Sequence, residues 1–313
     1  MVVPLLTRLH GRQPEVGIPM ERFYAYTGMS RQGYYQALSR QQHQSELMGQ
    51  IKEKIKAYRG SQDSRAGSRT LYYNLGIKEA YDLGVNKFER MLSAHGLCLK
   101  PLRTRVVTTQ STKQSWNYPD LSKGLVISRI NAIVVGDLTY VIYGKDRYYL
   151  FLLIDVYSAR IVGWAFSTRM PAEEAMKALT MWVLLRGKKA LRGCIHHTDG
   201  GGQYFSTLYL GAMQKLRLKI SVARSCLDNG FAEQRNGLLK NHLLPLLGPN
   251  MCIQKLQQEV SRLIHIYNHE RKQEKLGWKS PVEYETYWSG REDCPTMQLY
   301  NRDQNKRTRR FGF

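Results

Sequence analysis

Three β-rich segments separated by very short turns constrain the fold more than any other feature of this sequence. They are residues 130–143 (INAIVVGDLTYVIY), 146–157 (DRYYLFLLIDVY) and 159–167 (ARIVGWAFS). Turns of this length join neighbouring antiparallel strands. The sequence therefore predicts three antiparallel strands that follow one another in a single sheet.

Helices and strands alternate after these segments. Proline at the start and glycine at the end predict a helix over 171–187. The remaining elements expected are, in chain order, a strand that ends at Asp199, a helix around 206–216, a strand over 218–223 and a helix over 229–243 that Pro245 ends. Antiparallel strands followed by helix–strand alternation indicate an α/β protein, with a mixed sheet flanked by helices.

An all-α region with two candidate helix-turn-helix units precedes the sheet. In the first, residues 20–40, a helix runs into the turn TGM, and Ser30 is expected to cap a second helix. That helix is expected to bury Tyr34, Tyr35 and Leu38.

The second candidate unit covers residues 68–96. Asn86, followed three residues later by Glu89, resembles a capping box, and Gly96 is expected to end the helix. The apolar face of this helix would consist of Phe88, Met91 and Leu92. Two plain helical hairpins without a DNA-binding role are the alternative for the all-α region.

Positive charge is the strongest signal in the composition. Lys and Arg number 47 against 25 Asp and Glu, for a formal net charge of +22. A surplus of this size usually serves a polyanion such as nucleic acid, while solubility or a membrane-surface role is the alternative. Lys87 and Arg90 lie outside the apolar face of the second unit, where a recognition helix would meet DNA. Arg103 and Arg105 are expected DNA contacts in a basic linker, residues 101–125.

Several classes of protein are disfavoured by the sequence. No apolar run approaches the roughly 18 residues of a membrane helix, and the first residues lack the basic segment of a secretory signal. The five cysteines lie far apart without a C-x-x-C pair, so neither a zinc knuckle nor a disulfide framework is supported. A cytoplasmic, nucleoid-associated protein is expected.

Three acidic residues each interrupt or border an apolar element. Asp137 lies inside the first strand, Asp199 ends a later strand, and Glu233 lies one turn into the last helix of the sheet domain. A carboxylate inside a strand is costly unless it is paired, hydrogen-bonded or bound to metal. Three carboxylates from separate segments suit Mg²⁺, which prefers oxygen ligands, and Mn²⁺ could substitute. Two such ions per active site would serve phosphoryl transfer.

The helix that carries Glu233 has a polar face. Glu233, Asn236, Gly237 and Lys240 recur at i, i+3, i+4 and i+7 and so share one side of an α-helix. This face could contact DNA through Asn236 and Lys240. An ordinary solvated face with a Glu–Lys pair is the alternative.

Five motifs together resemble one family, the catalytic subunits of bacterial insertion-sequence transposases of the OrfB type. These enzymes belong to the retroviral-integrase superfamily and carry a DDE triad on a ribonuclease-H-like fold. The motifs are GDLTYV with the strands after it, HHTDGGGQYFS, SCLDNGFAEQRNGLLKNHL, YNHERKQEKLGWKSPVEYE and the N-terminal SRQGYY. The resemblance covers most of the chain.

The resemblance implies roles for particular residues. Asp137, Asp199 and Glu233 would be the metal-binding catalytic triad, Lys240 would meet DNA, and Asp155 would be structural. Two features depart from the family. The 33 residues between Asp199 and Glu233 are two fewer than is typical, and Gly200 stands where the family often has a basic residue.

The function that the resemblance implies is DNA transposition. A DDE transposase would cleave DNA at transposon ends in a Mg²⁺-dependent reaction and transfer the 3′-hydroxyl into target DNA. The alternatives are a ribonuclease-H-like nuclease without strand transfer and an inactive DNA-binding relic.

The partners expected are transposon-end and target DNA, further copies of the chain on DNA, and a separately encoded upstream helix-turn-helix protein. The expected organisation is a helix-turn-helix-like segment (1–45), a second helical DNA-binding region (46–100), the basic linker (101–125), an integrase-like catalytic core (126–245) and a C-terminal helix, loop and basic tail (246–313).

Overall fold

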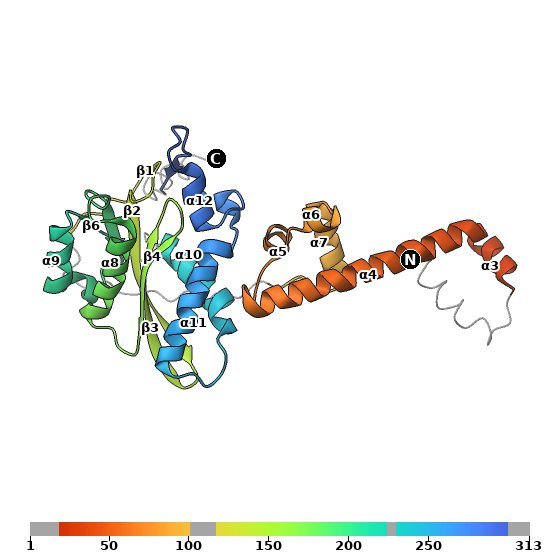
Figure 1. Ribbon diagram of the computed structural model, residues 1–313, viewed down its shortest axis with the longest axis horizontal. Helices are drawn as coiled ribbons and strands as arrows, with labels where there is room; N and C mark the ends of the chain where they lie inside the picture. The colour runs from red at the N-terminus through yellow and green to blue at the C-terminus, as the bar shows by residue number, and fades with distance from the viewer. Residues whose placement is uncertain (1–18, 101–116, 224–229, 300–313) are drawn as a thin grey trace, which may run out of the picture. The chain divides into compact units, whose positions relative to one another are not determined.

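The computed structural model of the chain describes residues 19–100, 117–223 and 230–299 (Figure 1). The chain divides into two compact units, Met1–Tyr58 and Arg59–Phe313. The expected boundary between residues 45 and 46 stays a prediction. Within the described residues, no helix is both long enough and apolar enough to cross a membrane.

The first unit consists of helix α3 (Met20–Thr27) and most of helix α4 (Arg31–Ser61). Gly28 ends α3 in the left-handed conformation, and the backbone N–H of Gly33 donates to Ser30 Oγ at 3.0 Å, as expected of the predicted cap. Tyr34 is fully buried, but Tyr35 is 47% exposed. The expectation that both tyrosines are buried was wrong for Tyr35, because consecutive residues of a helix point about 100° apart.

The second unit begins with three short helices, α5 (Ser68–Asn74), α6 (Ile77–Tyr81) and α7 (Val85–Ala94). Helix α7 is capped at Gly84, so the expected capping box at Asn86 was wrong. Glu89 is engaged elsewhere, because Ser68 Oγ donates to it at 2.9 Å and joins α5 to α7. Phe88 and Leu92 are fully buried, as their spacing predicted.

A buried carboxylate attaches this helical part to the rest of the second unit. Asp63 is fully buried and accepts hydrogen bonds from Arg271 Nε at 2.9 Å and His242 Nδ1 at 2.7 Å. Ser64 adds two hydrogen bonds, from its N–H and its hydroxyl, to the carbonyl of His242. Because both partners lie in the C-terminal part of the chain, this connection fixes the start of the helical part against residues 242–271.

A five-stranded mixed sheet forms the centre of the second unit. Its strands are β2 (Ile133–Tyr143), β3 (Asp146–Asp155), β4 (Ile161–Ser167), β5 (Ile195–Thr198) and β6 (Lys219–Val222). The order is β4-β3-β2-β5-β6, with β2, β3 and β4 antiparallel and β2, β5 and β6 parallel. The predicted mixed sheet is confirmed. Two short strands, β1 (Val126–Ile127) and β7 (Met297–Gln298), form a separate pair.

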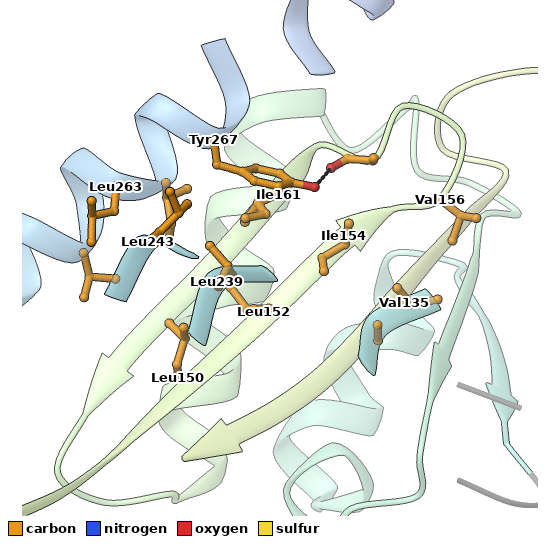
Figure 2. Close-up of a cluster of buried hydrophobic side chains, with 14 of the residues drawn as sticks. Val135, Leu150, Leu152, Ile154, Val156, Ile161, Leu239, Leu243, Leu263 and Tyr267 are labelled. Carbon is orange, nitrogen blue, oxygen red and sulfur yellow. Dashed lines mark hydrogen bonds between the residues drawn. The ribbon is translucent and has the colours of Figure 1, made fainter. Parts of the chain in front are cut away.

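Helices cover both faces of the sheet (Figure 1). Helices α8 (Ala172–Arg186) and α9 (Thr207–Lys215) cover one face, where Val134, Leu153 and Trp182 are buried together. The other face packs against α10 (Gly230–Leu238) and α11 (Ile253–His265), with the cluster of Figure 2 between them. Alternating side chains of β2 enter the two clusters, because successive residues of a strand point to opposite faces.

Figure 2 shows how the second cluster is built from the sheet and the C-terminal helices. Leu150, Leu152 and Ile154 of β3 meet Leu239 and Leu243 beyond α10. Tyr267 is fully buried in the same cluster, and its hydroxyl donates to the carbonyl of Ala159 at 2.8 Å. The cluster therefore fixes the position of α10 on the sheet.

The C-terminal region is more helical than the sequence indicated. The elements in chain order are α10, a π-helical segment (Leu239–Leu243), a 3-10 turn (Leu244–Leu246), α11, a second π-helical segment (Ile266–Glu270), a 3-10 turn (Glu274–Leu276) and α12 (Pro281–Trp288). Helix α12 was expected to be loop. The sequence does contain a pattern typical of a helix start here, because Ser280 and Glu283 form a full capping box and Pro281 occupies the first turn.

Four charged side chains hold α12 to the sheet. The Glu285 carboxylate accepts from Arg160 Nη1 at 2.6 Å and Arg186 Nη1 at 2.9 Å, and Arg186 Nη2 lies 3.8 Å from Asp155. Asp155 is fully buried and also accepts from the backbone N–H of Asn131 at 2.7 Å. Its partners are those of a structural residue.

Candidate active site

The register of the sheet places two of the predicted carboxylates side by side. Gly136 of β2 and Thr198 of β5 form the last pair of the parallel ladder between these strands. Asp137 directly follows Gly136, and Asp199 directly follows Thr198. Asp137 therefore lies where β5 ends and β2 continues with β3 as its partner.

Helix α10 brings the third carboxylate to this edge. Glu233 is in its first turn, and Asn236 follows three residues later. The side-chain amide of Asn236 donates a hydrogen bond to Asp137 Oδ2. Because that bond joins α10 to β2, it positions the helix that carries Glu233 next to the two aspartates.

Electrostatics indicates that the three carboxylates share one site. Burial, the charge of Asp199 and, to a smaller extent, the charge of Glu233 raise the pKa of Asp137 to about 7. Hydrogen bonds from the backbone of Leu138 and the side chain of Asn236 act in the opposite direction and lower this pKa. Burial also raises the pKa of Asp199, although the N–H of Gly201 donates to its carboxylate at 3.1 Å. Partial desolvation and the charge of Asp199 raise the pKa of Glu233. The charge of Asp199 thus opposes ionisation of both Asp137 and Glu233, and the charge of Glu233 opposes ionisation of Asp137.

The donor set suits a hard divalent cation. Carboxylate oxygens come from Asp137, Asp199 and Glu233, and Asn236 Oδ1 is buried without a hydrogen-bond partner in the described residues. In the described ranges, no three His, Cys, Asp or Glu side chains are already close enough to form a closed ligand set. The oxygen atoms of these side chains are of the kind that Mg²⁺ prefers as ligands.

Lys240 lies beside this site. Its Nζ is 4.4 Å from the centre of the Tyr140 ring, and Arg147 lies 5.3 Å from the same ring. Burial lowers the pKa of Lys240, and the charge of Asp137 opposes that shift. Tyr140 is 53% exposed, so two cations and an aromatic ring form a surface next to Asp137.

Two tyrosines and a histidine pack together beside the aspartates, and the histidine, His196, lies in β5, where a packing role rather than metal binding is expected of it. His196 is buried between the Val134 carbonyl at 3.2 Å and the Tyr209 hydroxyl at 2.9 Å, and burial lowers its pKa to about 4. It is therefore neutral near pH 7 and donates from Nδ1 to the carbonyl while Tyr209 donates to Nε2. Tyr204 stacks edge-on against His196, and burial together with Tyr209, Asp137 and Asp199 raises its pKa. In the sequence, Tyr204 could be found only through its position in the motif HHTDGGGQYFS, which also contains Asp199.

Gly200 has a conformational role after Asp199. Its φ is +85°, a region that residues with a Cβ rarely adopt. This turn lets the N–H of Gly201 return to the Asp199 carboxylate. A basic residue at position 200 would strain the turn in this conformation.

The expected DNA contacts fall in different environments. Lys87 and Arg90 are exposed on α7, whereas Asn236 is 5% exposed and engages Asp137. Arg103 and Arg105 lie outside the described residues, as does part of the shortened segment between Asp199 and Glu233. Contact with DNA stays a prediction for all six residues, Lys240 included.

A mixed sheet in this order, with carboxylates at the end of its parallel ladder and on a helix beside it, has the ribonuclease-H-like architecture. Two models described as integrase core domain match the chain, over residues 128–226 and 214–281. The first span contains Asp137 and Asp199, and the second contains Glu233.

Two relatives encoded by insertion sequences agree with this match. The chain is 30% identical over 265 residues to an uncharacterized protein of insertion element IS600 from Shigella sonnei, covering 82% of this chain and 95% of that protein. It is 27% identical to the transposase for insertion sequence element IS904 from Lactococcus lactis, covering 80% of this chain and 97% of the relative. A magnesium complex of the HTLV-2 integrase catalytic core domain matches 50% of this chain and 97% of that one, with 21% identity and a TM-score of 0.42. The chain belongs to the insertion-sequence transposases with an integrase core domain, which are polynucleotidyl transferases.

Proposed function

We propose that this chain is a DDE transposase that cleaves DNA at transposon ends and transfers the resulting 3′-hydroxyl into target DNA, with Mg²⁺ as cofactor. The observation that carries the proposal is the register of the sheet. Asp137 and Asp199 directly follow the last residue pair of two parallel strands, and Asn236 bonds α10, with Glu233, to Asp137.

Each residue of the site has a separate task in this proposal. Asp137, Asp199 and Glu233 would hold two Mg²⁺ ions, with Mn²⁺ able to substitute. When bound, such ions activate an attacking oxygen and stabilise the leaving oxygen of a phosphodiester. Asn236 orients Asp137, and Lys240 with Tyr140 contacts the DNA backbone beside the reacting phosphate.

The experiment is a strand-transfer assay with the Asp199→Asn variant. Purified chain is incubated with Mg²⁺, a labelled duplex carrying the element's terminal sequence and a supercoiled target plasmid. Wild-type protein is expected to join the label to the plasmid, and Asp199→Asn to lose this by at least about a thousandfold while still binding DNA. Asp293→Asn changes an exposed carboxylate and is the matched control.

Two outcomes would contradict the proposal. Cleavage of the labelled duplex without joining to the plasmid would indicate a nuclease on the same fold. Behaviour of Asp199→Asn that matches wild type in every assay would indicate a DNA-binding relic.

Assembly on DNA is part of the proposal. Two transposon ends must be cut and joined together, so more than one copy of the chain is expected in the active complex. The separately encoded upstream partner has no support among the relatives above and stays a prediction from the sequence resemblance.

A further inference from the structure

A basic groove of about 410 Å³ opens on the second unit beside α10. Its walls come from the start of α5, from α10 at Gln234 and Arg235, and from residues 271–275 with Trp278. Five basic side chains line it, namely Arg69, Arg235, Arg271, Lys272 and Lys275. The acidic side chains in the lining are Glu89 and Glu274.

Arg235 is the unusual member of this lining. It is 5% exposed, and its Nε is buried without a hydrogen-bond partner in the described part of the chain. Its guanidinium lies 4.9 Å from the Phe231 ring, and no described carboxylate is within 4.0 Å of it. A buried guanidinium is costly without an anion, and the ring replaces only part of the lost hydration.

The other basic residues differ in whether the protein already neutralises them. Arg271 pairs with Asp63 at 2.9 Å, and Arg69 lies 3.4–3.5 Å from Glu274 and Glu89. Lys272 and Lys275 donate instead to neutral oxygens, the Tyr73 carbonyl at 3.4 Å and the Gln234 amide at 3.3 Å. Among the described residues, Arg235, Lys272 and Lys275 therefore have no carboxylate partner.

We infer that this groove binds the phosphate backbone of a DNA strand, with Arg235 as the buried phosphate contact and Lys272 and Lys275 beside it. The inference rests on the proposed function. Gln234 and Arg235 lie on the same helix as Glu233, so the groove shares α10 with the carboxylate site, but Arg235 points to a different side of that helix from Glu233. A planar guanidinium suits a phosphate, since it can donate two parallel hydrogen bonds to it.

A long polyanion fits the groove better than an isolated anion. The three cations without carboxylate partners come from two separate segments, α10 and residues 272–275, and so can meet successive phosphates. The net charge of +22 provides the attraction for such a polymer.

The test measures how DNA affinity depends on salt. A fluorescent 40-base-pair duplex is titrated with full-length chain in EDTA at several salt concentrations, for wild type, Arg235→Gln, Lys275→Gln and Lys188→Gln. Each lost phosphate contact is expected to reduce the slope of log K against log salt by about 0.9 and to weaken binding about tenfold at low salt. Lys275 is exposed, so its variant stays folded even if Arg235→Gln perturbs α10, and the exposed Lys188 is the matched control.

The outcomes separate this inference from the proposed function. Slopes for Arg235→Gln and Lys275→Gln equal to that of Lys188→Gln would overturn the groove, even if wild type transfers strands normally. Reduced slopes together with absent strand transfer would support the groove and count against the proposed reaction. A rise in the unfolding temperature of wild type with inorganic phosphate, lost in Arg235→Gln but without any change in DNA slope, would show a free-anion site and overturn the inference.

Discussion

The side-chain amide of Asn236 donates a hydrogen bond to Asp137 and so ties α10 to the central strand β2. This bond favours the ionised form of Asp137, because it lowers a pKa that burial and Asp199 raise. Asn236 is thereby a positioning residue for the carboxylate in the centre of the site.

Asn236→Ala is expected to weaken the use of Mg²⁺. Loss of a hydrogen bond to a metal ligand typically costs 10- to 100-fold in metal affinity or activity, so the half-saturating Mg²⁺ concentration for DNA cleavage should rise by about that factor. A Mg²⁺ titration of cleavage measures it, with Asn86→Ala, an exposed amide on α7, as control. An unchanged half-saturating concentration would contradict the role given to Asn236.

Asp137→Asn is expected to stabilise the metal-free protein above pH 7. The folded pKa of Asp137, about 7, exceeds its unfolded value near 3.9, so the folded state binds more protons between these pH values and stability falls as pH rises through them. The penalty at pH 8 is at most about 4 kcal/mol. Thermal unfolding in EDTA should show the variant above wild type at pH 8, with a smaller difference at pH 5. Equal midpoints at pH 8 would refute the raised pKa.

Asp63→Asn is expected to destabilise the second unit by about 3–5 kcal/mol at pH 7, because it leaves the buried Arg271 unpaired. Burial would raise the pKa of Asp63, but His242 and Arg271 outweigh it and hold the pKa below its usual value. The stabilisation is therefore present above about pH 4 and is lost as pH falls through the folded pKa. Urea unfolding at pH 7 and pH 3, with the exposed Asp82→Asn as control, measures both effects. A loss no larger than that of the control would exclude this connection.

Gly163→Ala is expected to destabilise the sheet by about 1–3 kcal/mol or more. A Cβ at this position would lie 2.1 Å from the backbone oxygen of Ala178, so β4 and α8 would have to separate. Gly211→Ala in α9 meets no atom within 4 Å and should instead stabilise by up to about 1 kcal/mol. Calorimetry on the two variants compares them, and midpoint shifts of the same sign would show that β4 and α8 are packed differently.

The sheet and the two aspartates could be predicted from sequence because their signals are local. Apolar β-branched runs with short turns mark β2, β3 and β4, and Asp137 stands out as a charge inside one of them. That Asp199 lies next to Asp137 could be expected only from the family resemblance. The parallel ladder between β2 and β5 agrees with that expectation.

The helix that carries Glu233 was predictable only in part. A single α-helical period placed Glu233, Asn236 and Lys240 on one face, but α-helical geometry ends at Leu238 and a π-helical segment follows. Wider turns change the direction of later side chains, so Lys240 reaches Tyr140 while Asn236 is buried.

Long-range pairs gave no local signal. Asp63 and Arg271 are separated by 208 residues, and nothing around either residue indicates the other. The lack of a carboxylate near Arg235 could likewise be seen only in the folded chain, because Glu233 is close to Arg235 in sequence but interacts electrostatically with Asp137 and Asp199.

The ion pairs between Glu285 of α12 and the arginines beside the sheet make the stability of the fold depend on α12. Without Glu285, three of the four charged side chains remain, namely the two largely buried guanidinium groups of Arg160 and Arg186, and Asp155 as their single carboxylate. Copies of the gene that are interrupted before this codon should therefore yield chains that unfold and are degraded. The N-terminal helices, for which DNA contact is a prediction, would have little opportunity on such a truncated chain to occupy the element's ends in place of the complete enzyme.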